Sequence, residues 1–401
     1  MRKKSLAFII FLVSASLWVQ SIPAQSKLPV IRATSKKVSI NDGGYFEKDR
    51  WTLSPKVRPD IFTADRTRKT KWVTFYTDID SIRVKVNPGT RYNFVILLNS
   101  TDSCYTQIAS AILPKNKQNN NIETHDTIPF TLSTHNAIAV KAVINNIDTL
   151  TLHFDLSAFD ICLLKSAILT KTHLLANQPD ALAGKVKPNF SLMNKVTKLQ
   201  MGSMILTNPN IYTTEVTARD MDGRLGYNIF EGKIVEINYD LGLLIIHSKL
   251  PKIVRGYIRS ELGFKRSFGY INGTFAITGK KYKGDFFMDT GSEKAIILDS
   301  TWVSNNHFPT NLKVIKTTIL SDPRGAKYET RTVLAPNFTL YHTTLTNIPT
   351  LILGNQNPAG FPINFLGNDV LKRFNMILDL KTDHIYLKPD KLSAAVYYDN
   401  L

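Results

Sequence analysis

Residues 286–292 read Phe-Phe-Met-Asp-Thr-Gly-Ser, and this stretch is the most informative part of the 401-residue chain. Three large apolar residues lead into Asp289 and a turn of small residues, and a second apolar run follows at 295–298. Short apolar runs bounded by turn residues predict buried β-strands. We therefore expect the carboxyl group of Asp289 at the end of a buried strand, next to a tight turn.

An earlier part of the chain repeats this pattern. Residues 152–158 read Leu-His-Phe-Asp-Leu-Ser-Ala and place Asp155 after an apolar run, with another apolar run at 161–164. Both copies therefore predict a strand that ends in an aspartate, a tight turn and a second strand.

A second shared pattern follows each copy after nearly the same interval. Residues 224–230 contain Leu-Gly after a basic residue, and residues 365–371 contain Phe-Leu-Gly. Self-similarity at a fixed interval indicates two related structural units. We expect a first lobe over residues 128–250 and a second lobe over residues 260–392.

The combination of these elements resembles the aspartic peptidases, the pepsins and retropepsins, over roughly residues 128–392. The resemblance implies a mainly β, two-lobed, pepsin-like (acid protease) β-barrel fold. It also implies an endopeptidase that hydrolyses peptide bonds with water activated between two carboxylates. Asp289 and Asp155 would form this catalytic pair. The supporting positions would be Thr290, Gly291, Ser292, Leu156, Ser157, Gly226 and Gly367.

The first motif departs from the family pattern at two positions. Leu156 replaces the threonine whose hydroxyl ties the two motif loops together, and Ser157 replaces a glycine in the turn and adds a Cβ. Arg224 stands at an apolar position of the later element. A displacement of about 1 Å in a catalytic group can cost a hundredfold in rate. The sequence thus leaves two interpretations, an active endopeptidase and a catalytically inactive pseudo-peptidase that binds peptides or proteins.

Members of the family cover the two carboxylates with a β-hairpin flap. The corresponding hairpins would lie near residues 183–186 and 322–326, with Tyr328 as a candidate flap tyrosine or an ordinary strand aromatic. His153 lies two positions before the first aspartate, and Phe287 occupies the equivalent position in the repeat. We therefore expect His153 to be a packing residue.

The first residues predict export of the protein. Residues 1–24 combine a basic start, an uncharged apolar run at 5–19 and small residues before a cleavage site near Ala24. This is the pattern of a secretory signal peptide, and it predicts a periplasmic or secreted protein. In an oxidising compartment Cys104 and Cys162 could form a disulfide, or both could be buried thiols.

Outside the two lobes, the chain predicts a small N-terminal β domain at 26–112 and a polar linker at 113–127. Its strands are expected at 72–76, 81–86 and 92–98, and an Asn-Pro-Gly turn separates the last two. In the lobes, two short helices are expected at 300–305 and 368–374. Asp369 is expected to be a helix-start acid, and Asp379 and Asp383 are expected to be turn acids.

The chain has 50 Lys and Arg against 32 Asp and Glu, a formal net charge of +18. The excess is concentrated in the first 75 residues, without a nucleic-acid recognition signature. We expect no nucleic-acid partner, and membrane contact only through the basic N-terminal domain. The sequence has no nucleophile elbow, phosphate-binding loop, dinucleotide fingerprint or zinc-ligand spacing, so it predicts neither a cofactor nor a metal. Because both carboxylates come from one chain, we expect a monomer that takes peptide or unfolded protein substrates.

Overall fold

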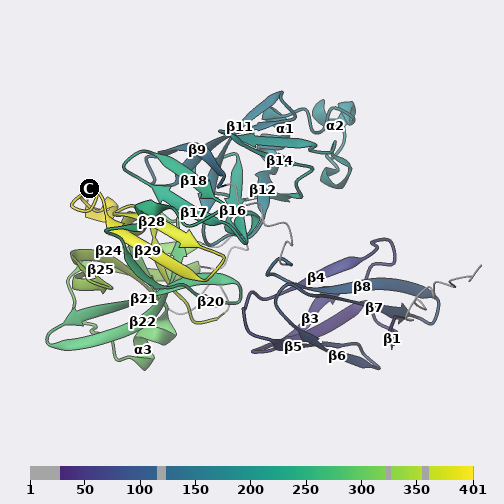
Figure 1. The fold of residues 1–401 in the computed structure, drawn as a ribbon, viewed down its shortest axis with the longest axis horizontal. Helices are drawn as coiled ribbons and strands as arrows, with labels where there is room; N and C mark the ends of the chain where they lie inside the picture. The colour runs from purple at the N-terminus through teal and green to yellow at the C-terminus, as the bar shows by residue number, and fades with distance from the viewer. Residues whose placement is uncertain (1–27, 115–122, 322–326, 355–360, 401) are drawn as a thin grey trace, which may run out of the picture. The chain divides into compact units, whose positions relative to one another are not determined.

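A computed structural model describes residues 28–114, 123–321, 327–354 and 361–400 (Figure 1). The predicted signal peptide lies outside the described residues. The chain divides into two compact units. The first comprises the residues up to 62 with 74–84 and 92–108, and the second comprises 63–73, 85–91 and the chain from 109 onward. The fold is mainly β, as the sequence predicts.

The N-terminal region forms two four-stranded sheets, ordered β3-β2-β5-β6 and β1-β7-β8-β4. The rings of Phe62, Phe75 and Phe94 meet edge to face in the core, with centroids 5.3 and 5.5 Å apart. The predicted strands at 72–76, 81–86 and 92–98 correspond to β5, β6 and β7. The bounds are β1 Val30–Ala33, β2 Lys37–Asp42, β3 Phe46–Thr52, β4 Asp60–Ala64, β5 Lys71–Tyr76, β6 Ser81–Val86, β7 Arg91–Leu98 and β8 Asp102–Ser110.

After β8, the chain continues with the strands of the first lobe. β9 starts at His125, inside the segment predicted to be a linker, because residues 125–129 pair with β18. The bounds are β9 His125–Leu132, β10 Ile138–Ile144, β11 Asp148–Asp155, β12 Ile161–Leu164, α1 Lys165–Lys171, α2 Pro179–Leu182, β13 Lys198–Met201, β14 Met204–Thr207, β15 Ile211–Thr214, β16 Gly223–Gly226, β17 Ile234–Asn238 and β18 Leu243–His247.

The second lobe has longer strands. Its helix α3 matches the predicted range and is capped by Asp299, whose carboxylate accepts the N–H groups of Thr301 and Trp302. The bounds are β19 Ile258–Glu261, β20 Gly263–Lys265, β21 Phe268–Ile277, β22 Lys280–Asp289, β23 Ile296–Leu298, α3 Ser300–Asn305, β24 Val314–Ser321, β25 Lys327–Leu340, β26 Thr343–Leu353, β27 Asn364–Gly367, α4 Asn368–Leu371, β28 Phe374–Asp379 and β29 His384–Pro389.

The strand pairing repeats between the two lobes. β11 runs parallel to β16 with Asp155 beside Gly226, and β22 runs parallel to β27 with Asp289 beside Gly367. In each lobe the strand after the aspartate, β12 or β23, pairs antiparallel with the opposite edge of the same glycine-bearing strand. The sequence repeat is therefore also a repeat in register.

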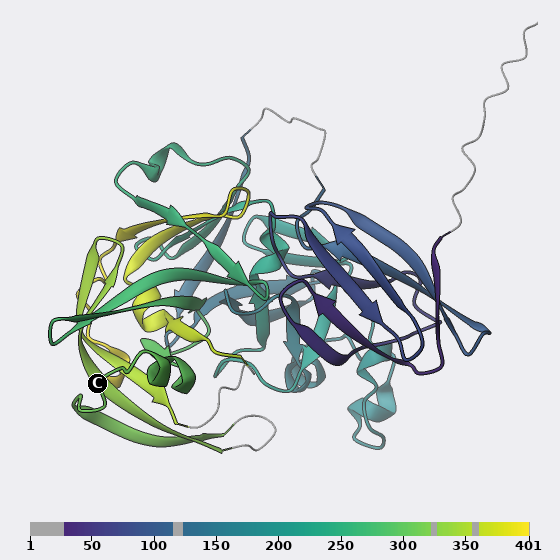
Figure 2. The same cartoon turned by 90° about the horizontal axis from the view of Figure 1, so that it is seen from below.

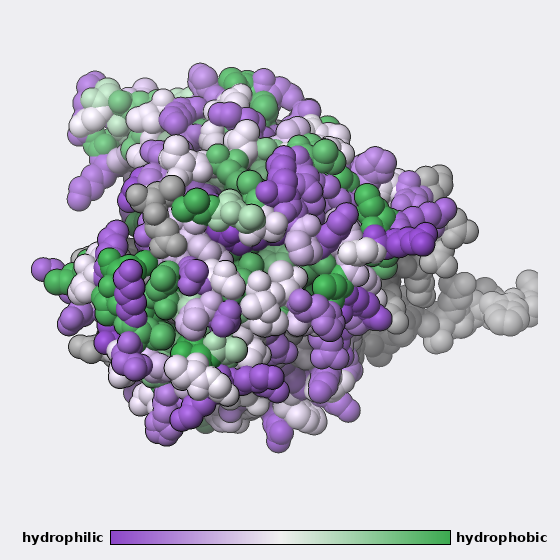
Figure 3. Space-filling view, turned by 90° about the vertical axis from the view of Figure 1, so that its left-hand side faces the viewer, coloured by the Kyte–Doolittle hydropathy of each residue, from purple (hydrophilic) through white to green (hydrophobic). Residues whose placement is uncertain are grey.

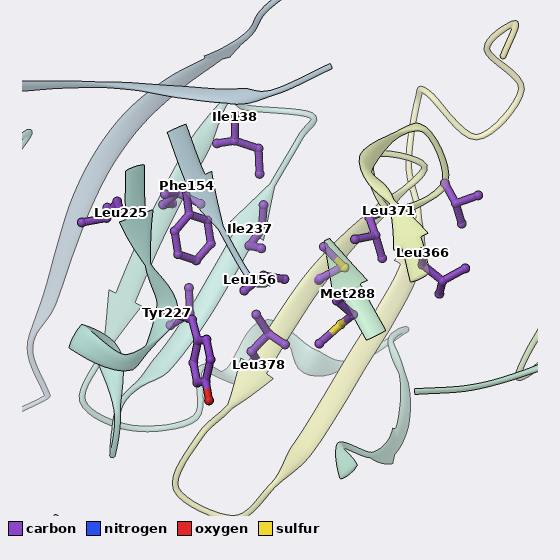
Figure 4. Packing of buried hydrophobic residues seen from close by; sticks show 14 of the residues in the cluster. Ile138, Phe154, Leu156, Leu225, Tyr227, Ile237, Met288, Leu366, Leu371 and Leu378 are labelled. Carbon is purple, nitrogen blue, oxygen red and sulfur yellow. The ribbon is translucent and has the colours of Figure 1, made fainter. Parts of the chain in front are cut away.

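The two lobes share a sheet and a core. β17 of the first lobe pairs with β28 of the second, and β18 and β29 flank them in the same sheet (Figures 1 and 2). One cluster of buried apolar side chains contains Phe154 and Leu225 of the first lobe and Met288 and Leu366 of the second (Figure 4). This continuous core fixes the two aspartate-bearing strands relative to each other.

One arginine of the basic N-terminal stretch, Arg66, is buried. The guanidinium group of Arg66 pairs with Glu231 and Asp383, each at 2.7 Å, and lies over the ring of Phe264. Asp383 also pairs with Arg68, so this turn acid neutralises part of the basic excess.

The surface carries both hydrophilic and hydrophobic side chains. On the face shown in Figure 3, hydrophilic residues cover most of the surface, with hydrophobic residues between them. Scattered exposed apolar residues are normal for a globular chain. In the described part of the chain, no helix combines the length and apolar character that a membrane span requires. Cys104 and Cys162 are both free and buried, in agreement with the second of the two sequence interpretations.

Candidate active site

Two equivalent strand ends place Asp155 and Asp289 at one site. The apolar residues before each aspartate are buried, and Phe154 and Met288 pack in the core. Asp155 is 7% exposed, whereas Asp289 is partly exposed. Packing on both sides of each strand therefore holds the backbone of both acids in place.

The turn after each aspartate has the same hydrogen-bond pattern. Asp155 Oδ1 accepts the N–H of Ser157 at 2.8 Å, and Asp289 Oδ1 accepts the N–H of Gly291 at 3.1 Å. Ser157 does not adopt a positive φ, so its Cβ does not strain the turn. The serine in the first motif thus preserves the local geometry that glycine has in the second.

Gly226 and Gly367 support the two turns by close backbone contact. A Cβ on Gly226 would lie 2.3 Å from the carbonyl carbon of Phe159, and one on Gly367 would lie 2.0 Å from the carbonyl oxygen of Lys294. No other residue type fits such approaches without a shift of the backbone. Both glycines therefore pack directly against the backbone that follows the two aspartates.

A threonine hydroxyl joins the two motif turns from one side. Thr290 is fully buried, and its Oγ1 donates to the carbonyl of Phe154 at 2.8 Å and accepts the N–H of Leu156 at 3.0 Å. Leu156 cannot return this bond. Its side chain instead packs among apolar residues that include Met288 and Leu378 (Figure 4). The cross-lobe tie is therefore made by the second motif alone.

The hydroxyl of Ser157 lies between the two carboxylates. Its Oγ is 2.7 Å from Asp155 Oδ1 and 3.2 Å from Asp289 Oδ1. A hydroxyl has one proton to donate, so it binds one carboxylate at a time. Both aspartates line the cavity described below, where water or substrate can reach them.

The electrostatics of the pair favour a shared proton. Burial, followed by the charge of Asp155, raises the pKa of Asp289 to about 7, although the hydrogen bonds from Ser157 and Gly291 oppose this shift. Two carboxylates this close cannot both ionise without a large cost. The pair can therefore supply one proton and accept another near neutral pH or below it.

A cavity of about 520 Å³ opens over the pair. The two aspartates, Ser157, Gly291 and Ser292 lie along its floor, and residues 214–218 line one side. His153 and Arg224 also line this cavity, although neither was predicted from the sequence to be a site residue. A larger cavity of about 830 Å³ in the second lobe lies around α3 and contains none of the predicted site residues.

The predicted first flap is wrong. Residues 183–186 are not a β-hairpin but follow helix α2, because Pro179 begins a helical turn and Gly184 closes it with a φ of +72°. The predicted second flap, 322–326, lies outside the described residues. Tyr328 belongs to strand β25, and its side chain also lies outside the described part.

Several other sequence expectations are settled by their contacts. Asp369 lies in the first turn of helix α4, and its carboxylate is buried against Lys372 at 2.8 Å. Helix α4 ends at Leu371, earlier than predicted, because β28 begins at Phe374. Asp379 accepts two backbone N–H groups of the following turn, as expected for a turn acid. No group of side chains within the described ranges has the composition of a metal site.

His153 is buried as predicted, but it does not behave as a simple packing residue. It is 3% exposed, and neither ring nitrogen has a hydrogen-bond partner among the residues that the structure describes. Burial lowers the pKa of His153, with a smaller contribution from Arg224, although the charge of Asp155 opposes the shift. Burial therefore favours the uncharged form of the imidazole, and His153 lines the cavity.

Comparison with known proteins gives a fold and no family. Neither a protein-family model nor a curated protein matches this chain. Among solved structures, the aspartic proteinase from Irpex lacteus is similar over 68% of this chain and 100% of its own, with a TM-score of 0.44 and 12% identity. At these values the similarity is one of fold and carries no functional information.

Proposed function

We propose that the protein is an exported aspartic-type endopeptidase in which Asp155 and Asp289 activate water. One observation carries the proposal: two aspartates far apart in the sequence end equivalent strands, and the Ser157 hydroxyl lies within hydrogen-bond distance of both, at the floor of a cavity. Export is proposed from residues 1–24 of the sequence. A monomer suffices because one chain supplies both carboxylates.

The positions of the two acids suggest separate roles. Asp289, with its raised pKa of about 7, holds the shared proton in acid. Asp155 accepts the N–H of Ser157 and is the carboxylate closer to its hydroxyl, and we assign it as the general base that removes a proton from water. The water oxygen then attacks the peptide carbonyl carbon, and Asp289 donates its proton to the carbonyl oxygen.

The second half of the reaction restores the pair. The tetrahedral diol breaks its C–N bond, and the leaving amine takes the proton that Asp155 removed from water. A diol hydroxyl returns its proton to Asp289 as the carbonyl re-forms. No covalent link to the chain is formed.

A second candidate function is a peptide-binding module without turnover. Two observations favour it: Leu156 gives no hydroxyl to the cross-lobe tie, and the Ser157 hydroxyl stands between the carboxylates. In this case the cavity would bind peptide while the two carboxylates stay hydrogen-bonded to the Ser157 hydroxyl and activate no water.

The test is cleavage of a denatured protein mixture between pH 3 and pH 8, with fragments identified by mass spectrometry. The test variant is Asp289→Asn. Its matched control is Asp285→Asn, which changes an exposed acid on the same strand β22. We expect cleavage by the unmodified protein and by the control, and none by Asp289→Asn. Cleavage that survives in Asp289→Asn contradicts the proposal, and binding without cleavage by the unmodified protein favours the second candidate.

A further inference from the structure

A row of side chains beside the catalytic pair differs between the two lobes. In the first lobe, His153 on β11 pairs with Arg224 on β16, which pairs with Cys162 on β12. Residues paired in register point to the same face of a sheet. Because side chains alternate along a strand, His153 also shares this face with Asp155, two positions later.

The second lobe has apolar residues at the same three register positions. Phe287 pairs with Phe365, and Phe365 pairs with Ile297. Phe287 is buried, and its ring lies 6.3 Å from that of Phe365. In the second lobe these positions therefore hold only apolar packing residues. In the first lobe, two of them hold the polar residues His153 and Arg224 instead.

The polar groups of the first-lobe row are left without partners in the protein. Both ring nitrogens of His153, the Nε of Arg224 and the Oγ1 of Thr217 are buried and make no hydrogen bond within the described protein. All three residues line the cavity over the two aspartates. A buried polar group without a partner costs about 1–3 kcal/mol, so a ligand that satisfies these groups gains binding energy.

The charges around this row define what it can bind. Arg224 is the only lysine or arginine among the cavity-lining residues that the structure describes. The acids that face the cavity are the catalytic pair and Glu215, and Glu215 is already bonded to Lys165. The guanidinium group of Arg224, the imidazole of His153 and the hydroxyl of Thr217 therefore place several hydrogen-bond donors at one part of the cavity wall.

We propose that His153, Thr217 and Arg224 form a pocket for a carboxylate of the substrate, next to the bond that is cut. The guanidinium group pairs with carboxylates through parallel hydrogen bonds, and the imidazole N–H and threonine hydroxyl add two more donors. The proposal rests on the proposed function, because it assigns specificity to that same site. The carboxylate can belong to an acidic side chain or to the end of a peptide chain.

The experiment measures binding, so that it does not depend on turnover. The probes are N-acetylated decapeptide mixtures, randomised except for a central Glu or a central Gln, with amidated ends. A third mixture carries the central Gln and a free C-terminal carboxylate. Retention of each mixture on immobilised Asp289→Asn protein is quantified by mass spectrometry. The same measurement is made after Arg224→Met, and after Arg255→Met as an exposed-arginine control outside the cavity.

We expect at least tenfold greater retention of a carboxylate-bearing mixture than of the amidated Gln mixture, lost in Arg224→Met and kept in Arg255→Met. Preference for the Glu mixture identifies a side chain as the source, and preference for the free-ended mixture identifies a chain end. Equal retention of all three mixtures overturns the proposal, as does a preference that survives Arg224→Met. The comparison of the three peptide mixtures needs no pocket variant. It therefore tests whether the cavity prefers a carboxylate even if Arg224→Met does not fold.

Failure of this proposal is distinct from failure of the proposed function. Peptides that bind without regard to a carboxylate refute the pocket, while cleavage that depends on Asp289 still supports the peptidase. Conversely, a carboxylate preference in a protein that never cleaves supports the pocket within a binding module.

Discussion

Replacing Thr290 by valine tests the one-sided tie between the lobes. Valine has nearly the same shape as threonine but no hydroxyl, so the substitution leaves the N–H of Leu156 and the carbonyl of Phe154 without their partner. Thr290 is fully buried, so bulk water cannot take the place of the lost hydroxyl. Each orphaned buried group costs about 1–3 kcal/mol, so we expect the free energy of unfolding to fall by about 2–5 kcal/mol.

The assay is urea unfolding followed by circular dichroism, with Thr344→Val as the control. Thr344 is exposed on β26, and its hydroxyl bonds to that of Thr339 at 3.0 Å. Loss of an exposed bond of this kind changes stability by less than about 0.5 kcal/mol. If Thr290→Val unfolds within about 0.5 kcal/mol of the control, the tie does not hold the two motif turns together, and the reasoning is refuted.

Five further outcomes follow from the geometry of the pair and of the turns around it. Cleavage should be strongest in acid and fall as pH rises through about 7, because Asp289 then loses the proton it donates; a rate that is flat across this range would contradict the assigned role. The same raised pKa should make the folded state lose stability as pH rises from 3.8 to about 7, and thermal melts of Asp289→Asn should lack this loss. Ser157→Gly removes a hydrogen bond that lowers the pKa of Asp289, so the falling limb of the pH–rate profile should move to higher pH; a shift to lower pH is the opposing result. Gly291→Ala would bring a Cβ within 3.1 Å of a catalytic carboxylate oxygen and should lower the rate at least tenfold, whereas Gly44→Ala, with nothing within 4 Å, should leave the rate unchanged. Leu156→Thr places a hydroxyl in an apolar space and should destabilise the protein by about 1–3 kcal/mol in urea unfolding, and an unchanged midpoint would show that a hydroxyl is accommodated there.

The sequence predicts the repeat and the strand ends well, for a physical reason. Asp155 and Asp289 follow short runs of large apolar residues, and a run that is buried on both faces can only be an interior strand. The glycines at 226 and 367 are equally informative, because their close backbone contacts exclude every larger residue. These signals are local, so a single sequence carries them.

The polar corner of the cavity could not be predicted in this way. His153 and Arg224 are far apart in the sequence, and only the parallel pairing of β11 with β16 brings them to one face. Comparison with Phe287 led to the expectation of a packing residue, which is correct for burial but misses the unpartnered nitrogens. The signal that was present in the sequence was Arg224, a charge at an apolar position of the repeat.

The failed flap prediction has a different cause. The equivalent distance along the repeat places it near residue 183, but Pro179 favours the start of a helix at this point and overrides the analogy. The side of the cavity is instead lined by residues 214–218, which follow the short strand β15 and have no strong periodic pattern. Loops of this kind are positioned by their neighbours rather than by their own sequence.

The most direct test of the central claim, that Asp155 and Asp289 act as one site, is a double-mutant comparison of cleavage rates. Residues that act as a unit are strongly non-additive, so removing either one costs nearly as much as removing both. We predict that Asp155→Asn, Asp289→Asn and the double variant lose cleavage to the same residual level while their unfolding midpoints show that they remain folded. Losses that multiply in the double variant, or substantial cleavage in either single variant, would contradict a shared site.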